Sequence, residues 1–156
     1  CVPEALKQLN VALDVYHQCG QNHAEATQAR YAHKPDHLQV EVQPFIEDMA
    51  KAYSDADLII CRAGALTVTE VATAGVAAVF VPLPSAVDDH QTANAKFLAD
   101  LGAAKICPQA SMTPESLTTL LTPLMNRQLL SEMAVKARQQ AQPDATQHVV
   151  ELIQEL

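Results

Sequence analysis

Apolar and polar residues follow two alternating patterns along this chain. Residues 11–18 (VALDVYHQ) and 38–43 (LQVEVQ) place apolar side chains at every second position, which indicates strands with one covered face. Residues 57–64 (DLIICRAG) form an apolar run with almost no alternation, which is typical of a strand covered by helices on both faces. Residues 77–83 and 103–107 are further apolar runs of strand length. The pattern therefore predicts a strand in each of these segments.

The segments between the strands carry helix signals. Pro3 suits the first turn of a helix over residues 3–9, and Gly75 is placed to end a helix over residues 66–75. Thr113 is an N-cap candidate directly before Pro114. Further helices are predicted within residues 17–37 (before a break at Pro35), 44–56, 89–101, 127–141 and 143–156. Strand and helix alternate throughout, which predicts an α/β fold: a Rossmann-like, doubly wound layer with a mostly parallel sheet.

Residues 1–156 are expected to form a single domain, because the chain has no internal repeat and no linker-like stretch. It is 49% apolar but only 4% aromatic, so the core must be built mainly from Ala, Val, Leu and Ile. The net charge of −8 comes with ten scattered basic residues, and such a surface repels phosphate backbones. Nucleic acid is therefore not an expected partner.

The cysteines and the longest apolar run bear on the cellular compartment. Cysteines stand at positions 1, 19, 61 and 107 without a CxxC pair or a secretory leader, which favours reduced thiols in the cytosol. The longest apolar run, from Val76 to Leu83, contains Pro82 and is too short to span a bilayer. The chain opens as CVPEALKQL without an initiator methionine, so we expect a piece of a longer polypeptide.

In parallel sheets, ligands bind beyond the carboxyl ends of the strands, where loops lead into helices. The unusual polar residues of this chain gather after the predicted strands, in residues 17–20 (HQCG), 44–49 (PFIEDM), 62–70 (RAGALTVTE) and 84–95 (PSAVDDHQTANA). We therefore expect the functional site at this edge of the sheet.

The segment 62–70 allows two interpretations. Gly64 permits a sharp turn, and the helix that follows presents unpaired N–H groups that suit a diphosphate. Thr67 and Glu70, however, have the spacing of a capping box, which is a general signal of a helix start. In the functional interpretation, Glu70 accepts hydrogen bonds from a ribose diol. Spacing alone favours the cap, and both interpretations stay open.

The segment 84–95 is also ambiguous. Asp88 or Asp89 is explained as a helix N-cap. His90, Gln91 and Asn94 would then lie in the first turns of the helix, where an imidazole and two amides suit the hydroxyls of a sugar. Ordinary solvated side chains are an equally good explanation of these three residues.

The sequence gives little support for a metal site or for a catalytic base in this chain. Asp55 and Asp57 have the Asp-x-Asp spacing of metal-dependent glycosyltransferases but precede a buried strand, opposite the expected site, and are interpreted as a turn. His33 and His37 are separated by Pro35, which breaks the helix that would align them, so no metal site is predicted. His17 follows a strand and is interpreted as structural, with the alternative that it borders the site.

Taken together, residues 17–20, 44–75 and 87–106 resemble the C-terminal half of the MurG family of bacterial peptidoglycan glycosyltransferases, in order, spacing and identity. The similarity extends from about Pro3 to Glu151. It implies a GT-B enzyme whose C-terminal half binds UDP-N-acetylglucosamine (UDP-GlcNAc) and whose N-terminal half binds the lipid acceptor. The implied reaction transfers GlcNAc, with inversion, to the C4 hydroxyl of undecaprenyl-diphospho-MurNAc-pentapeptide (lipid I) and makes lipid II.

The resemblance also implies residue roles. Ile46 would offer its backbone to the uracil, and Glu70 would bind the ribose. The sites implied for the phosphates and the sugar are Ala65, Leu66, Thr67, His90 and Gln91, with Arg62, Gly64, Asn94 and His17 as further possible contacts. His90 stands where many relatives have glutamine. The family's glycine-rich GGS turn and the strand before it would precede Cys1.

The same resemblance implies no cofactor, a peripheral location on the cytoplasmic face of the bacterial inner membrane, and a catalytic base in the N-terminal half. Membrane contact is expected through that half and not through this chain. The chain alone is expected to bind the donor weakly and to be inactive, because the GGS turn is absent from it. An open sheet edge could drive self-association. Two other functions stay open: a GT-B transferase with a different UDP-sugar or lipid acceptor, such as a galactolipid synthase relative, and a non-catalytic α/β interaction domain.

Overall fold

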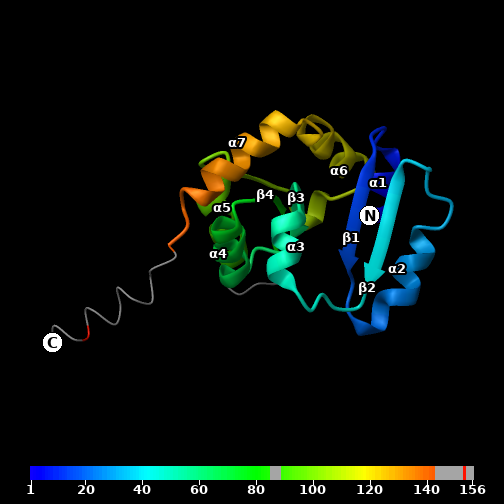
Figure 1. Cartoon of the computed structure of the whole chain (residues 1–156), viewed down its shortest axis with the longest axis horizontal. Helices are drawn as coiled ribbons and strands as arrows, with labels where there is room; N and C mark the ends of the chain where they lie inside the picture. Colours follow the sequence, from blue (N-terminus) through cyan, green and yellow to red (C-terminus); the bar gives the residue numbers. More distant parts are fainter. Residues whose placement is uncertain (85–88, 143–152, 154–156) are drawn as a thin grey trace.

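The computed structural model describes residues 1–84, 89–142 and 153, and Figure 1 shows how their helices and strands are arranged. All five strands in this part of the chain pair in parallel. The strands are β1 (Leu13–Gln18), β2 (Leu38–Gln43), β3 (Leu58–Cys61), β4 (Ala77–Phe80) and β5 (Ala104–Ile106). The α-helices are α1 (Val2–Gln8), α2 (Ala24–Arg30), α3 (Met49–Asp55), α4 (Ala65–Ala74), α5 (His90–Ala99), α6 (Pro114–Leu121) and α7 (Arg127–Arg138). Short 3-10 turns are η1 (Gln21–His23), η3 (Gln109–Ser111) and η4 (Thr122–Leu124).

Among the described residues, the strands pair as two sheets, β1–β2 and β3–β4–β5. Among the strands that the structure describes, β1 pairs only with β2, and β3 pairs only with β4 on one side. Figure 1 shows the two sheets at separate places in the molecule, with β1 and β2 on the right. The α/β class and the parallel direction are therefore confirmed.

The burial of β3 differs from the sequence analysis. All four β3 residues are only half-buried, whereas the β4 residues are fully buried. An apolar run without alternation predicts cover on both faces, and β4, with neighbours on both sides, has that cover. Among the described strands, β3 has a partner on one edge only, and its side chains keep partial access to water.

One apolar cluster nevertheless joins the two sheets. Leu38 of β2 and Val79 of β4 belong to the same buried group, together with Leu6 of α1 and Leu117 and Leu121 of α6. Its aliphatic members are mostly Leu, Val and Ala, as the low aromatic content predicts. A second cluster fills the space between the β3–β5 sheet and the helices α4 and α5 and contains Phe80 and Leu98. Burial of these side chains is the main stabilising contribution to the arrangement.

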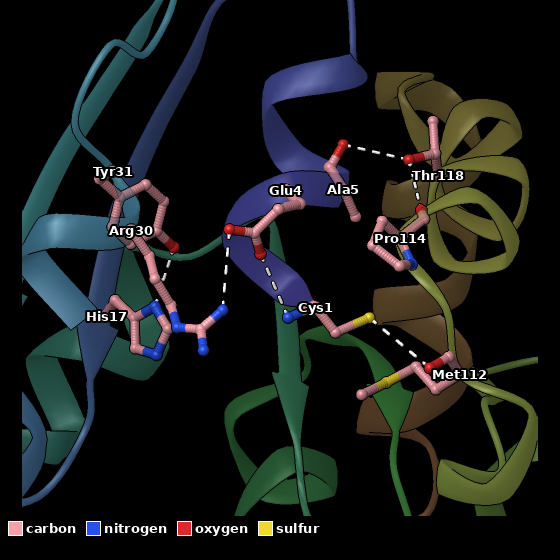
Figure 2. Close-up of polar contacts among 9 residues, drawn as sticks. All are labelled: Cys1, Glu4, Ala5, His17, Arg30, Tyr31, Met112, Pro114 and Thr118. Atoms are coloured by element: carbon pink, nitrogen blue, oxygen red, sulfur yellow. Dashed lines mark hydrogen bonds and ion pairs between the residues drawn. The ribbon is translucent and has the colours of Figure 1, made fainter. Parts of the chain in front are cut away.

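Helix α1 is held by polar contacts as well as by the core, as Figure 2 shows. Glu4 lies near the N-cap nitrogen of Cys1 (3.2 Å) and the guanidinium of Arg30 (3.9 Å). The Thr118 hydroxyl of α6 donates to the Ala5 carbonyl at 3.2 Å. These contacts fix α1 against α2 on one side and α6 on the other.

The helix signals in the sequence are largely confirmed. Thr113 caps α6 in a reciprocal pair with Ser116, and Pro114 is the first helical residue. Gly75 ends α4 with φ of 68°, a left-handed conformation that glycine adopts without strain. Residues 143–152 and 154–156 lie outside the described residues, and most of the last predicted helix falls there.

Candidate functional site

We call the segments that follow β2, β3 and β4 the carboxyl rim: residues 44–48, 62–64 and 81–84, with the first two turns of α4 and α5. These are three of the four segments in which the sequence analysis expects the site, and the fourth, residues 17–20, lies at the carboxyl end of β1. Because paired strands are parallel, the carboxyl ends within each sheet lie on the same edge. In Figure 1, the arrowheads of β1 and β2 point toward the loop that leads into α3. Ligands of parallel α/β proteins bind at such an edge.

Helix α4 starts at Ala65, with Gly64 as its N-cap. Thr67 and Glu70 are therefore the third and sixth helical residues, and the capping-box interpretation of this pair is wrong. Among the described residues, no side chain caps this helix, so its first amides keep their donor capacity. Gly64 has φ of −62°, which any residue adopts, and a Cβ there would meet only Thr67 Oγ1 at 3.7 Å. The fold therefore does not require glycine at this position.

Glu70 is exposed on α4 and is held by a residue of the neighbouring helix. The Tyr53 hydroxyl donates to Glu70 Oε2 at 3.0 Å. Burial and this bond to a carboxylate raise the pKa of Tyr53 well above its ordinary value, so the hydroxyl stays protonated. Burial, with a smaller contribution from the Glu70 charge, raises the pKa of the Cys61 thiol to about 12, which makes that thiol unreactive at neutral pH. The Tyr53 hydroxyl therefore orients the Glu70 carboxylate at the rim.

Three polar side chains of the rim brace its loops. The Arg62 guanidinium donates from Nη1 to the Val81 and Pro82 carbonyls at 3.1 and 3.3 Å. Asn94 Nδ2 donates to the Ala63 carbonyl at 3.1 Å, and Gln91 Oε1 accepts from the Leu83 amide at 2.9 Å. The loops after β3 and β4 are therefore tied to each other and to α5.

These contacts rule out the solvated interpretation for two residues of the segment 84–95. Gln91 and Asn94 are half-buried and bonded to backbone, so they are not merely solvated side chains. Asp89 is the N-cap residue of α5 with φ of 52°, and its carboxylate accepts from the Thr92 hydroxyl at 2.7 Å. The other N-cap candidate, Asp88, lies outside the described residues. His90 is the exposed first residue of α5.

Ile46 and Phe45 follow β2 and differ in exposure. Ile46 is buried, with 8% of its surface exposed, whereas Phe45 is 65% exposed. Ala65 and Leu66 are exposed in the first turn of α4, and Leu66 is 80% exposed. Apolar side chains that stay in water beside unpaired amides offer a surface for a ligand with both planar and charged parts.

His17, at the end of β1, contacts a different part of the molecule. Its Nδ1 shares a hydrogen bond of 2.8 Å with the Tyr31 hydroxyl, and Figure 2 shows the two side chains pointing toward each other. Burial lowers the pKa of His17, so the imidazole is neutral at pH 7. This contact supports the structural interpretation of His17.

One surface hollow lies away from the rim. It measures about 550 Å³ and is lined by residues at the amino ends of β3 and β4, including Asp57 and Gly75, and by Arg127 of α7. A second hollow of about 400 Å³ lies between α3 and α4 and includes Met49, Tyr53 and Glu70. The second hollow therefore borders the candidate site.

The described residues carry neither a metal cluster nor a membrane-spanning helix. That part of the chain contains no cluster of three or more His, Cys, Asp or Glu side chains that could hold a metal ion. Asp55 pairs with Lys51 at 2.6 Å, and Asp57 directly precedes β3 at its amino end. None of the helices described here is long and apolar enough to cross a bilayer.

Sequence reasoning did not single out Tyr53, which contacts the Glu70 carboxylate at the rim. Tyr53 lies in mid-helix with no motif around it, and only the packing of α3 on α4 brings it to Glu70. No local sequence signal could have paired these residues, because they are 17 positions apart on different helices.

The chain matches one protein family and several curated proteins. The Glycosyltransferase family 28 C-terminal domain matches residues 1–149. A curated relative from Acinetobacter baumannii is 77% identical over 99% of the chain, and one from Stutzerimonas stutzeri is 49% identical over 99%. Both are named UDP-N-acetylglucosamine–N-acetylmuramyl-(pentapeptide) pyrophosphoryl-undecaprenol N-acetylglucosamine transferase. The chain spans less than half of their length, 42% and 44% respectively.

Solved structures agree with this assignment. The crystal structure of Acinetobacter baumannii MurG superposes with a TM-score of 0.97 at 77% identity, over 99% of this chain and 45% of that one. The glycosyltransferase VinC superposes with a TM-score of 0.70 at 18% identity, over 99% of this chain and 37% of that one, which shows a common fold alone. From the parallel strands, the rim and these matches, we conclude that the chain belongs to the glycosyltransferase family 28 C-terminal domain family.

Proposed function

We propose that this chain is the donor-binding half of an inverting glycosyltransferase that moves GlcNAc from UDP-GlcNAc to lipid I, making lipid II for peptidoglycan. The enzyme would work as a peripheral protein on the cytoplasmic face of the bacterial inner membrane. The names of the 77% and 49% identical relatives support this reaction. Full-length enzyme here means this chain together with the N-terminal part that those longer relatives carry.

One observation carries the proposal: the loop before the uncapped start of α4, the helix of exposed Glu70, is tied by the Asn94–Ala63 hydrogen bond to α5, which carries the braced residue Gln91. A nucleoside diphosphate sugar has a diol, two phosphates and a hexose, and each finds a suitable group there. Carboxylates accept from hydroxyls, and helix amides with the partial positive charge of the helix start bind phosphate.

In this proposal, the donor lies along the rim. The Ile46 backbone contacts the uracil, Glu70 accepts from the ribose diol, and the α4 amides of Ala65, Leu66 and Thr67 lie beside the diphosphate. His90 and Gln91 contact the GlcNAc. Because Gln91 Oε1 already accepts from the Leu83 amide, its side-chain N–H groups are the part that would donate to the sugar oxygens.

The chemical step needs a stabilised leaving group and a base. Amide donors at the start of α4 would stabilise the negative charge that develops on the departing UDP. Arg62 is oriented by the Val81 and Pro82 carbonyls and would add positive charge to the same loop. We assign the base that takes the acceptor proton to the N-terminal half. Binding of the lipid acceptor and contact with the membrane are assigned to that half as well.

The decisive experiment is a transfer assay on the full-length enzyme with radiolabelled UDP-GlcNAc and a lipid I analogue. Formation of the labelled lipid II analogue is expected. Turnover with UDP-galactose in preference to UDP-GlcNAc would instead favour a related transferase with a different donor. Absence of both turnover and a nucleotide-dependent thermal shift would favour a non-catalytic domain.

The role of Glu70 has its own test. Glu70→Gln in the full-length enzyme should weaken UDP-GlcNAc binding, because a carboxylate that accepts from the ribose becomes a neutral amide. Helix α4 should tolerate the change, since Glu70 is not part of its N-cap. Titration by calorimetry compares the two proteins, and equal donor affinity would remove Glu70 from the site.

We also propose that the chain alone self-associates. The β1 and β3 strands each have an edge that no described strand pairs with, and such edges attract further strands. Sedimentation of the isolated chain should show concentration-dependent dimers. A monomer at high concentration would refute this proposal and leave the catalytic one untouched.

A further inference from the structure

Tyr53 and Glu70 form a hydrogen bond between two helices that meet at the candidate site. The Tyr53 hydroxyl of α3 lies 3.0 Å from Glu70 Oε2 of α4, and the two helices pack against each other. Glu70 is exposed and Tyr53 is half-buried, with its hydroxyl at the surface hollow between the helices. The apolar ring of Tyr53 therefore anchors in the protein while its polar end reaches a carboxylate at the rim.

The bond from Tyr53 uses only part of the hydrogen-bonding capacity of the Glu70 carboxylate. An ionised carboxylate has two oxygens and about four acceptor positions, of which Tyr53 uses one on Oε2. Oε1 and the remaining acceptor position of Oε2 can accept from other donors. An exposed glutamate without such a bond would sample several rotamers, so the phenol limits the direction in which the free oxygen points.

The position of Tyr53 along the chain adds a second argument. Helix α3 begins at Met49, three residues after Ile46, and its N-cap Asp48 accepts from the Lys51 amide at 2.8 Å. The same short helix therefore carries the Tyr53 hydroxyl and continues the segment proposed to contact the uracil. Ile46 lies in the loop directly before α3, so the uracil contact and Tyr53 are separated by only a short stretch of chain.

We propose that Tyr53 is a positioning residue for nucleotide binding: it fixes the Glu70 carboxylate in the orientation that accepts from the ribose hydroxyls. This inference rests on the proposed function and adds a residue to it. Tyr53 does not itself touch the donor. Its contribution is to order Glu70 before the nucleotide arrives, which lowers the entropy lost on binding.

The test compares Tyr53→Phe with the unchanged full-length enzyme. The change removes one hydroxyl and keeps the ring, so the packing of α3 is preserved. The KM for UDP-GlcNAc should rise about three- to tenfold, the scale set by ordering one flexible side chain, while kcat stays within about twofold. Tyr16→Phe is the matched control, because Tyr16 is an exposed tyrosine of β1, and no effect is expected there.

Ribose analogues separate positioning from a general structural effect. With 2′-deoxy and 3′-deoxy UDP-GlcNAc, measured separately, the KM penalty of Tyr53→Phe should shrink for at least one analogue, since the hydroxyl that Glu70 accepts is then absent. An equal penalty on all three donors, or no penalty on UDP-GlcNAc, would overturn the inference. Thermal melting of both tyrosine variants checks that their folding is preserved.

The Glu70→Gln measurement, made in parallel, separates the positioning role of Tyr53 from the ribose-binding role of Glu70. If Glu70→Gln weakens donor binding and Tyr53→Phe does not, the positioning role fails and the donor site stands. If neither change alters binding, the ribose role of Glu70 fails as well, and with it the inference about Tyr53.

Discussion

The side-chain amide of Asn94 donates to the backbone carbonyl of Ala63 at 3.1 Å, joining the first turns of α5 to the loop after β3. Ala63 is fully buried, and it is followed by Gly64, the N-cap of α4. The Asn94 side chain therefore links the N-terminal part of α5 to the N-terminus of α4. This contact positions the α4 amides proposed to bind the diphosphate.

Asn94→Asp should destabilise the protein more than Asn94→Ala. The aspartate keeps the shape but places a carboxylate oxygen against the Ala63 carbonyl, so a hydrogen bond becomes a repulsion. We expect a loss of about 1–3 kcal/mol for aspartate and about 1 kcal/mol for alanine. Urea denaturation of both variants measures the difference. Equal losses would mean that the Asn94 amide does not face that carbonyl in solution.

Gly64→Ser should change stability and donor affinity in opposite directions. Serine adopts the Gly64 backbone conformation readily, and its hydroxyl can accept from the first amides of α4, which raises stability by a few tenths of a kcal/mol. The same hydroxyl would occupy amides that the diphosphate needs. Loss of one such charged bond corresponds to on the order of tenfold weaker UDP binding or more.

Calorimetry with UDP and thermal melting test the two parts of this prediction on the full-length enzyme. A more stable variant with unchanged UDP affinity would show that the diphosphate does not use the α4 amides.

Gln91→Glu should impair donor use without loosening the loop. The glutamate oxygen still accepts from the Leu83 amide, but the side-chain N–H donors are lost and a negative charge is added beside the proposed sugar position. The KM for UDP-GlcNAc should rise about tenfold or more, since a bond to a sugar oxygen is replaced by repulsion. Steady-state kinetics measure it. Gln109→Glu, the same change on the exposed turn η3, is the control and should leave KM unchanged.

The stability of the chain should depend on His17 in mildly acidic solution. Burial lowers the pKa of His17 in the folded protein below its unfolded value of about 6.5, so the unfolded chain binds the extra proton more readily. The stabilisation is therefore present above about pH 6.5 and is lost as the pH falls through the folded-state pKa. His17→Gln removes the titrating group and keeps a polar side chain near Tyr31.

Free energies of unfolding measured between about pH 7.5 and pH 5 should fall less steeply for His17→Gln than for the unchanged chain. An NMR titration of the imidazole gives the folded-state pKa directly. A pKa at or above the ordinary histidine value would contradict the prediction.

Local signals in the sequence determined most of the elements of this protein. The strand over residues 38–43, the Thr113 cap of α6 and the end of α4 at Gly75 follow from alternation, side-chain capping and the left-handed freedom of glycine. The placement of polar residues after the strands also located the rim, because parallel strands bring their carboxyl ends to one edge. Each of these inferences needs only neighbouring residues or the strand direction.

The tertiary structure decided what no local pattern encodes. It set the strand order β1–β2 and β3–β4–β5 among the described residues, because hydrogen bonding between strands depends on which edges meet in space. It moved the start of α4 to Ala65, so the Thr67–Glu70 spacing was not a cap, and it paired Tyr53 with Glu70 across two helices. Gln91 and Asn94 likewise acquired defined backbone partners only when the loops after β3 and β4 packed against α5. Contacts between residues distant in sequence arise from the packing of whole elements, and the chemistry of the rim depends on them.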